Sequence, residues 1–182
     1  MEKSMVIEDF IEPGPEIGKA RPKAPPGQKI QQILVLVDPA NHCQASIAYA
    51  IGLASVFGST MALVHFYQEP YVLESSLHRR NCDVFKLQRR KVFADFTDLL
   101  QKARDRYPKS VGYFEYGNSD HDICKIAGQL NADLVVLAAH KDRWLERVFA
   151  GRHANRILAD APCPILIVRE EETDFIDGSE QA

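Results

Sequence analysis

Short apolar runs alternate with longer stretches of helical period between residues 29 and 169. The runs predict strands at residues 33–37, 61–66, 111–116, 133–138 and 164–168. Two runs, LVVLA at 134–138 and ILIV at 165–168, lack polar residues, as strands buried on both faces of a sheet require. Strands that alternate with helices build βαβ units. The sequence therefore predicts an α/β domain with a five-stranded parallel sheet, helices on both faces and right-handed crossovers.

The segments between the runs each carry one apolar face. Apolar residues recur at helical intervals in 47–54 and in 123–130. A longer helix is predicted from about residue 80 to 106, and its apolar face consists of Val92, Phe96, Leu99 and Ala103. A last helix is predicted at 152–160, before Pro162 and Pro164. These helices complete the alternation that the strands require.

The two ends of the chain differ in composition from the middle. Residues 1–28 contain five prolines among glycines and charged residues, which predicts a disordered arm. Residues 170–182 contain six acids and no base, which predicts a solvated acidic tail. Either end could also be a segment that docks on a partner. The chain is therefore divided into an arm at 1–28, one domain at 29–169 and a tail at 170–182.

Composition also restricts the location and the partners of the protein. The net charge of −3 creates no field that attracts phosphate backbones, so nucleic-acid binding is not expected. No apolar run approaches the roughly 20 residues that cross a bilayer, and the N-terminus lacks the pattern of a signal peptide. The four cysteines form no C-x-x-C pair, which argues against a zinc site. We expect a cytoplasmic chain with reduced thiols, bound neither to membrane nor to metal.

The candidate ligand residues follow strands one, two and four, because open α/β sheets bind ligands at the carboxyl ends of their strands. Asp38 and Pro39 end the first predicted strand, and HFYQEP at 65–70 ends the second. Residues 138–155 follow the fourth and contain Lys141, Arg143, Arg147 and Arg152. Such a loop before a helix suits an anion such as phosphate. A strand-ending aspartate and a solvated basic loop explain the same residues without a ligand.

Catalytic motifs are missing from the sequence. It contains no G-x-G-x-x-G, no Walker P-loop, no G-x-S-x-G and no H-E-x-x-H. His140 and His153 flank the basic loop and could bind a metal or transfer a proton, although histidines also occur in polar loops without such a role. We therefore predict no catalytic residue, no metal ligand and no enzyme activity.

The segment ADLVVLAAHKDRWLERVFAGRHANRILADAPCPILIVRE, residues 132–170, resembles the universal stress protein family. The family carries a motif G-x2-G-x9-G-[S/T] that holds the phosphates of ATP, followed by A-P-C-P. The resemblance implies a sheet of strand order 3-2-1-4-5. It places the motif on Ala138, Lys141, Gly151 and Arg152, the family's acid on Asp38, and its base-contacting position, after His65, on Phe66.

Only one of the four motif positions, Gly151, keeps the family's residue. Lys141 and Arg152 introduce side chains where backbone amides would meet phosphate. His140, Asp142 and Trp144 match the H-x-D-x-W of the A-type branch, which lacks the glycine motif and is not thought to bind ATP. The resemblance therefore implies no cofactor. The alternative is weak binding of ATP or ADP by the remaining cations.

The last predicted strand should lie at an edge of the sheet, where PILIVRE leaves an apolar row open to pairing. Family members pair this strand between two protomers, which implies a homodimer through Ile165, Ile167 and Val168. The leading hypothesis is a non-catalytic dimeric protein that binds other proteins under stress. An ATP- or ADP-binding stress sensor is the alternative, and a small enzyme on the same fold is a third.

Overall fold

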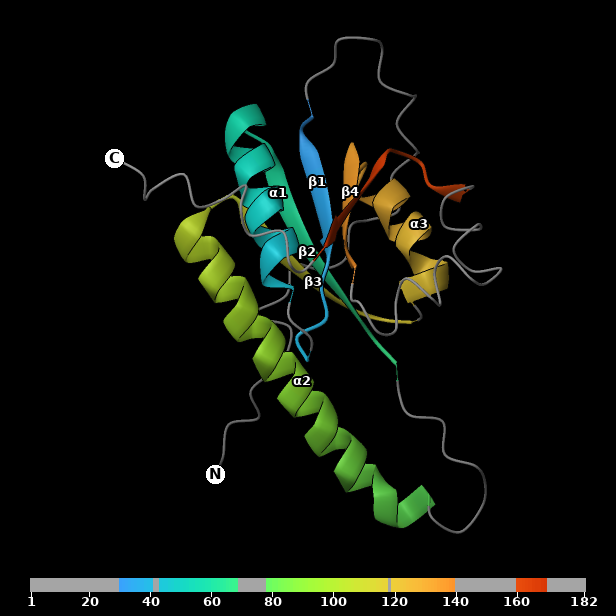
Figure 1. Cartoon of the computed structure of the whole chain (residues 1–182). Coiled ribbons are helices and arrows are strands. Elements are labelled where there is room, and N and C mark those ends of the chain that lie inside the picture. The colour runs from blue at the N-terminus through green and yellow to red at the C-terminus, as the bar shows by residue number, and fades with distance from the viewer. Residues whose placement is uncertain (1–29, 41–42, 69–77, 118, 140–159, 170–182) are drawn as a thin grey trace.

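The computed structural model describes residues 30–40, 43–68, 78–117, 119–139 and 160–169. Its elements, in chain order, are β1 (Gln32–Leu36), α1 (Gln44–Phe57), β2 (Thr60–Tyr67), α2 (His78–Arg106), β3 (Ser110–Tyr116), α3 (Ser119–Gln129), β4 (Leu134–Ala139) and β5 (Ile165–Arg169) (Figure 1). The strands and helices predicted in these ranges are confirmed to within a few residues. The helix predicted at 152–160 lies outside the described residues except for Asp160.

The five strands form one parallel sheet in the order β3-β2-β1-β4-β5. Helices α1 and α2 cover one face of the sheet and α3 lies on the other, as Figure 1 shows. The predicted architecture and strand order are therefore confirmed. The division into arm, domain and tail stays a prediction, because residues 1–29 and 170–182 lie outside the described chain.

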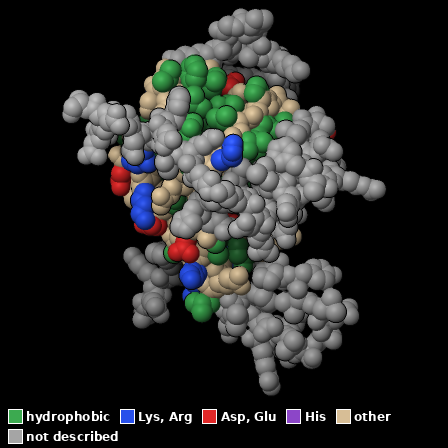
Figure 2. All heavy atoms as spheres, viewed as in Figure 1, with side chains coloured by type: hydrophobic (Ala, Val, Ile, Leu, Met, Phe, Trp, Pro, Cys, Tyr) green, Lys and Arg blue, Asp and Glu red, His purple; other side chains and the backbone are tan. Residues whose placement is uncertain are grey.

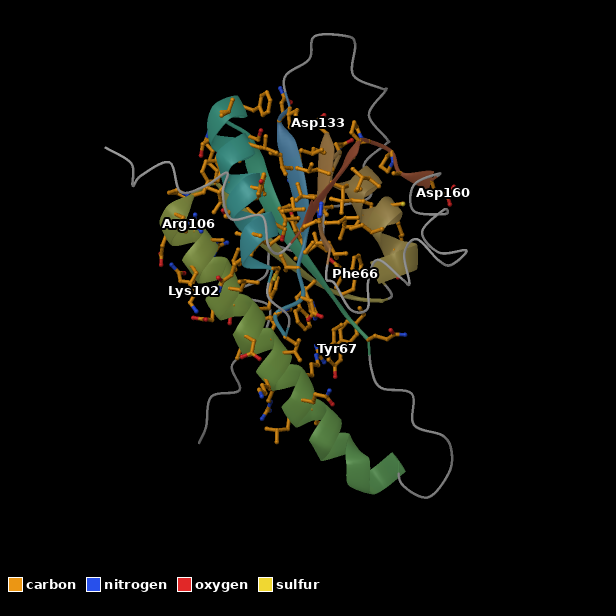
Figure 3. All side chains as sticks on the ribbon, viewed as in Figure 1. Phe66, Tyr67, Lys102, Arg106, Asp133 and Asp160 are labelled. Carbon is orange, nitrogen blue, oxygen red and sulfur yellow. The ribbon has the colours of Figure 1, made fainter. Side chains whose placement is uncertain are left out.

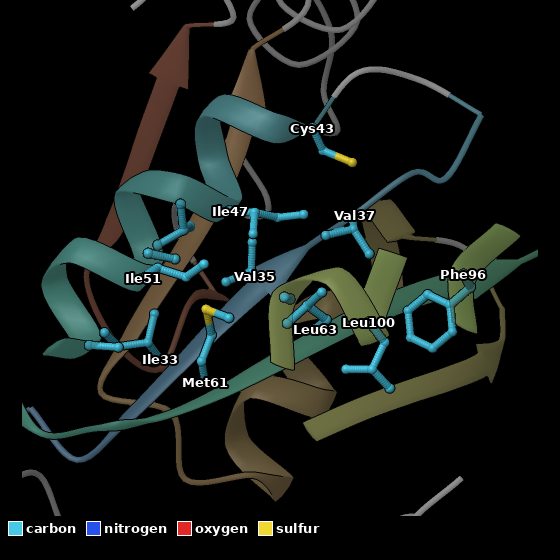
Figure 4. Packing of buried hydrophobic residues seen from close by; sticks show 14 of the residues in the cluster. Ile33, Val35, Val37, Cys43, Ile47, Ile51, Met61, Leu63, Phe96 and Leu100 are labelled. Atoms are coloured by element: carbon cyan, nitrogen blue, oxygen red, sulfur yellow. The ribbon is translucent and has the colours of Figure 1, made fainter. Parts of the chain in front are cut away.

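Buried side chains fill both faces of the sheet, since neighbouring residues of a strand point to opposite sides. In β1, Ile33 and Val35 pack toward α1 and α2 with Met61 and Leu63 of β2, as Figure 4 shows. Leu34 points the other way, into the cluster beneath α3. Full burial of one such side chain stabilises the fold by about 1.5–3 kcal/mol. This two-sided burial explains why the sequence of each strand is almost continuously apolar.

Polar contacts hold the starts and ends of the elements in register. Asp133 was predicted as the first residue of a strand, but it precedes β4. Its Oδ2 accepts hydrogen bonds from the backbone N–H groups of Gln31 (2.8 Å) and Gln32 (3.0 Å). Helix α1 ends at Gly58, whose φ of 69° is left-handed. The two bonds of Asp133 align β1 with β4, and therefore also align the carboxyl ends of these strands.

Helix α2 is longer than the strands beside it. Its 29 residues span about 43 Å, whereas the seven residues of β3 span about 23 Å. The C-terminal half buries Phe96, Leu100 and Ala103 against the sheet. The N-terminal half continues past the carboxyl edge of the sheet, as Figure 1 shows. No helix in the described ranges has both the length and the apolarity needed to cross a membrane.

Candidate functional site

The candidate site lies at the carboxyl ends of β1 and β4, where the strand order reverses. From β1 the chain proceeds to β2 and β3 on one side, and after α3 it returns to place β4 and β5 on the other side. Ligands of open α/β sheets bind at this kind of position. The relevant described residues are those that follow β1 and those that end β2 and β4.

The turn after β1 is closed by hydrogen bonds between its backbone and its own side chains. The N–H of Ala40 donates to Asp38 Oδ1 at 3.1 Å, a bond of the kind that stabilises aspartate turns. The thiol of Cys43, which precedes α1, donates to the backbone oxygen of Asp38 at 3.3 Å. Pro39 is partly exposed between them. These contacts fix the carboxylate of Asp38 at the end of the strand, where it can accept hydrogen bonds from a ligand's hydroxyl or amine groups.

His65 of β2 supports this turn from inside the sheet. Its Nδ1 donates to the carbonyl oxygen of Val37 at 3.0 Å, directly before Asp38. The imidazole is 8% exposed and packs beside two rings, 5.3 Å from the centroid of Phe114 and 6.2 Å from that of Phe96. Burial lowers the pKa of His65, while the bond to Val37 and the charge of Asp38 act in the opposite direction. A neutral ring therefore holds the end of β1 in place.

The structure does not bring all of the predicted site residues to one face of the sheet. Phe66, labelled in Figure 3, is partly buried against the cluster beneath α3. Ala138 of β4 packs toward α1, on the opposite face. Asp38 and Pro39 lie at the edge between these faces. The other four predicted residues, His140, Lys141, Gly151 and Arg152, lie outside the described residues.

The described part of the chain holds no group of three or more His, Cys, Asp or Glu side chains suited to a metal ion. Two of its thiols are also poorly suited to nucleophilic work. Burial, together with the charges of Asp133 and Cys124, raises the pKa of Cys163 to about 11, and burial raises the pKa of Cys124. Thiols with raised pKa values stay protonated near neutral pH and react slowly. Cys124 and Cys163 are therefore poorly suited to act as nucleophiles near neutral pH.

Sequence reasoning singled out Asp38 and missed the part played by His65. In the sequence, His65 stands out only as the first residue of the candidate stretch HFYQEP and as the neighbour of Phe66. A usable signal was present, because a histidine within the apolar run MALVHFY must lie inside the sheet and needs a hydrogen-bond partner there. The pairing with Val37 depends on the register of β1 and β2, which no local pattern specifies.

Comparison with protein families gives a match to the universal stress protein family over residues 29–169. The chain belongs to this family. Among curated relatives, a universal stress protein of Thermus aquaticus is 28% identical over 144 residues, which cover 75% of this chain and 97% of the relative. The resemblance in the sequence is therefore confirmed at the level of the family.

Solved structures of universal stress proteins share the fold. UspA of Lactobacillus plantarum superposes with a TM-score of 0.64 at 21% identity, covering 79% of this chain and all of the other. The protein of Archaeoglobus fulgidus in complex with dAMP superposes with a TM-score of 0.51 at 14% identity, covering 78% and 99%. At these identities the comparison establishes a common architecture and no more. The dAMP is a ligand of the Archaeoglobus protein.

Proposed function

We propose that this universal stress protein is a non-catalytic, homodimeric stress-response protein that acts by binding other proteins and carries an altered nucleotide site. The observation that carries the proposal is the sequence of the loop after β4. The first two of the family's three glycine positions and its hydroxyl position correspond here to Ala138 at the end of β4, to Lys141 and to Arg152. Side chains at these positions keep backbone amides away from phosphate oxygens. Triphosphate is therefore not held in the family's manner.

The described part of the site agrees with binding without catalysis. Asp38 presents a carboxylate, and His65 is used internally by its bond to Val37. Because neither of these groups forms a nucleophile paired with a base, the geometry offers recognition rather than bond cleavage. The cytoplasm is the proposed location, and nucleic acid is not a proposed partner.

The proposed homodimer uses β5, which ends the sheet beside β4. Ile165 and Ile167 are half-buried in one protomer and share a face, because strand residues alternate. Val168 points the other way and is only 2% exposed, packed in the cluster that includes α1. In this dimer Val168 therefore contributes its backbone, while the two isoleucines contribute side chains.

A second candidate is an ATP- or ADP-binding stress sensor. It is favoured by Asp38, which stands in a built turn at the switch point, and by the dAMP complex of the related Archaeoglobus fulgidus protein. In this case cations of the 138–155 loop would replace the missing amides as phosphate ligands. The two candidates differ in their affinity for triphosphate.

Titration calorimetry of the full chain with ATP, ADP and AMP separates the two candidates. For the binding protein we expect no heat of binding up to about 1 mM ATP, a limit that corresponds to about −4 kcal/mol. Lys141→Gly combined with Arg152→Ser should create ATP binding by freeing the backbone amides. Asp38→Asn in that background should weaken it again, because a charged acceptor is lost.

Micromolar ATP binding by the unaltered chain, weakened by Arg152→Ser, would establish the sensor instead. Mass spectrometry of ligands released from denatured protein provides an independent check. A stoichiometric adenine nucleotide that copurifies with the chain would contradict the leading proposal, whatever the calorimetry shows.

A further inference from the structure

Charge is unevenly distributed along the chain. Residues 29–169 contain 18 Lys and Arg against 14 Asp and Glu, so the domain is a net cation. Residues 170–182, EEETDFIDGSEQA, contain six acids and no base. The overall charge of −3 conceals this opposition. Opposite net charges attract the anionic segment to the cationic domain.

A strong concentration of positive charge lies in the N-terminal half of α2. Residues 86–91, KLQRRK, hold four cations in six positions, and no acid occurs between 84 and 94. Lys86, Arg90 and Lys91 are exposed. Along the C-terminal part of the same helix, by contrast, Asp side chains lie among the Lys and Arg side chains, as Figure 2 shows. One example is the 2.7 Å ion pair between Lys102 and Asp98.

The end of β3 adds an apolar ring to this concentration of charge. Arg89 lies over the ring of Tyr116, 4.7 Å from its centroid, and so links α2 to the carboxyl end of β3. Tyr116 remains 52% exposed, one of the few large apolar side chains among the described residues that is open to solvent. We call Lys86, Arg89, Arg90, Lys91 and Tyr116 the basic surface. It offers cations together with an aromatic ring.

We propose that residues 170–182 of the same chain dock on the basic surface. The segment matches it in chemistry, because Phe175 and Ile176 stand between Asp174 and Asp177 and follow three consecutive glutamates. An apolar pair flanked by acids fits an aromatic ring flanked by cations. Attachment to the same chain supplies an effective concentration of roughly millimolar, so weak contacts suffice.

The topology places the segment within reach of the basic surface. All five strands are parallel, so Arg169 at the end of β5 and Tyr116 at the end of β3 lie at the same edge of the sheet. The two strands are separated by four strand spacings, about 19 Å in total. Thirteen extended residues span up to about 43 Å. The segment can therefore cross the edge of the sheet and still follow α2 for several residues.

Carbodiimide coupling of the full chain tests the proposal, because this reagent joins carboxylates only to amines that they touch. We expect peptide mapping to find acids of 170–182 coupled to Lys86 and Lys91 about fivefold more than to Lys102 and Lys125. Arg89→Glu combined with Arg90→Glu should lower this coupling about fivefold. The double variant reverses the charge of two residues of the basic surface and leaves both lysine amines in place. High salt should have a similar effect.

Arg106→Glu with Lys109→Glu is the matched control, because it reverses two exposed charges at the other end of α2. It should leave the coupling to Lys86 and Lys91 unchanged. Equal coupling to all four lysines would overturn the proposal. A mixture of chains with and without ¹⁵N distinguishes the source of the segment: coupling found only between two chains would overturn docking within one chain and assign the surface to a second copy.

Discussion

Burial of His65 makes the stability of the fold depend on pH in the weakly acidic range. Burial lowers its pKa below the ordinary value of 6.5 in the folded chain, whereas the unfolded chain titrates near that value. At a pH between these two pKa values, the unfolded chain binds more protons than the folded chain. The free energy of unfolding therefore falls as the pH drops below 6.5, by at most about 1.4 kcal/mol per pH unit, and levels off below the folded pKa.

Replacement of His65 by Asn tests this response. His65→Asn keeps a donor for the carbonyl of Val37 and removes the titration. We expect urea unfolding between about pH 7.5 and about pH 5.5 to show a smaller loss of stability in this variant than in the unaltered chain. His65→Phe keeps the ring contacts with Phe96 and Phe114 but loses both the titration and the donor. It should therefore also show the smaller pH dependence, and at about pH 7.5 it should be about 1–3 kcal/mol less stable than the unaltered chain. Equal pH dependence in all three proteins would contradict the assignment.

Helix α2 rests on β3 through a glycine that leaves no room for a side chain. A Cβ on Gly112 would overlap the side chain of Leu100 and lie 3.2 Å from Phe96 Cε1. Gly112→Ala should therefore lower the free energy of unfolding by about 1–3 kcal/mol, and Leu100→Ala by about 2–5 kcal/mol. In the double variant the new methyl group enters the space that Leu100 vacates. Chemical denaturation should show that the double variant loses less stability than the sum of the two single losses, by about 1 kcal/mol or more.

Gly52 of α1 provides a matched control for the same substitution. A Cβ there would meet no atom within 4 Å, and the residue lies inside a helix. Gly52→Ala should raise the free energy of unfolding by about 0.5–1 kcal/mol, because alanine loses less backbone entropy. Strict additivity of Gly112→Ala and Leu100→Ala would show that the two side chains do not share the space between α2 and β3.

The helices and strands could be predicted from the sequence where the local spacing of apolar residues distinguishes the two. Burial on both faces of the sheet makes each strand an almost continuous apolar run, and the spacing of Phe96 and Ala103 indicates the buried face of α2. Leu100 was missed because Leu99 satisfies the same spacing, and only the position of Gly112 shows which leucine is more deeply buried. The site was less predictable. Asp38 could be predicted because it comes directly after a strand. The bond between His65 and Val37 could not, because it depends on how β1 and β2 pair.

At the scale of the whole molecule, the two edges of the sheet are protected differently. At the β3 edge, Arg104 of α2 donates from Nε to the backbone oxygen of Ser110 at 3.0 Å, so a charged side chain already occupies the start of that strand. At the other edge, Ile165, Leu166 and Ile167 of β5 are half-buried. Charged side chains and covering helices prevent edge pairing, whereas an apolar edge favours it. This asymmetry favours association through β5 over association through β3.

Ile167→Lys should therefore dissociate the proposed homodimer. The substitution places a charge in an apolar contact that two copies would share, where an unpaired charge is costly. Light scattering at micromolar concentration should give twice the chain mass of 20.5 kDa for the unaltered protein and the single mass for Ile167→Lys. Val56→Lys, which changes a side chain that is 77% exposed on α1, should remain dimeric. Thermal unfolding establishes that both variants fold. A mass of 20.5 kDa for the unaltered chain, or an unchanged dimer in the folded Ile167→Lys variant, would exclude β5 as the interface.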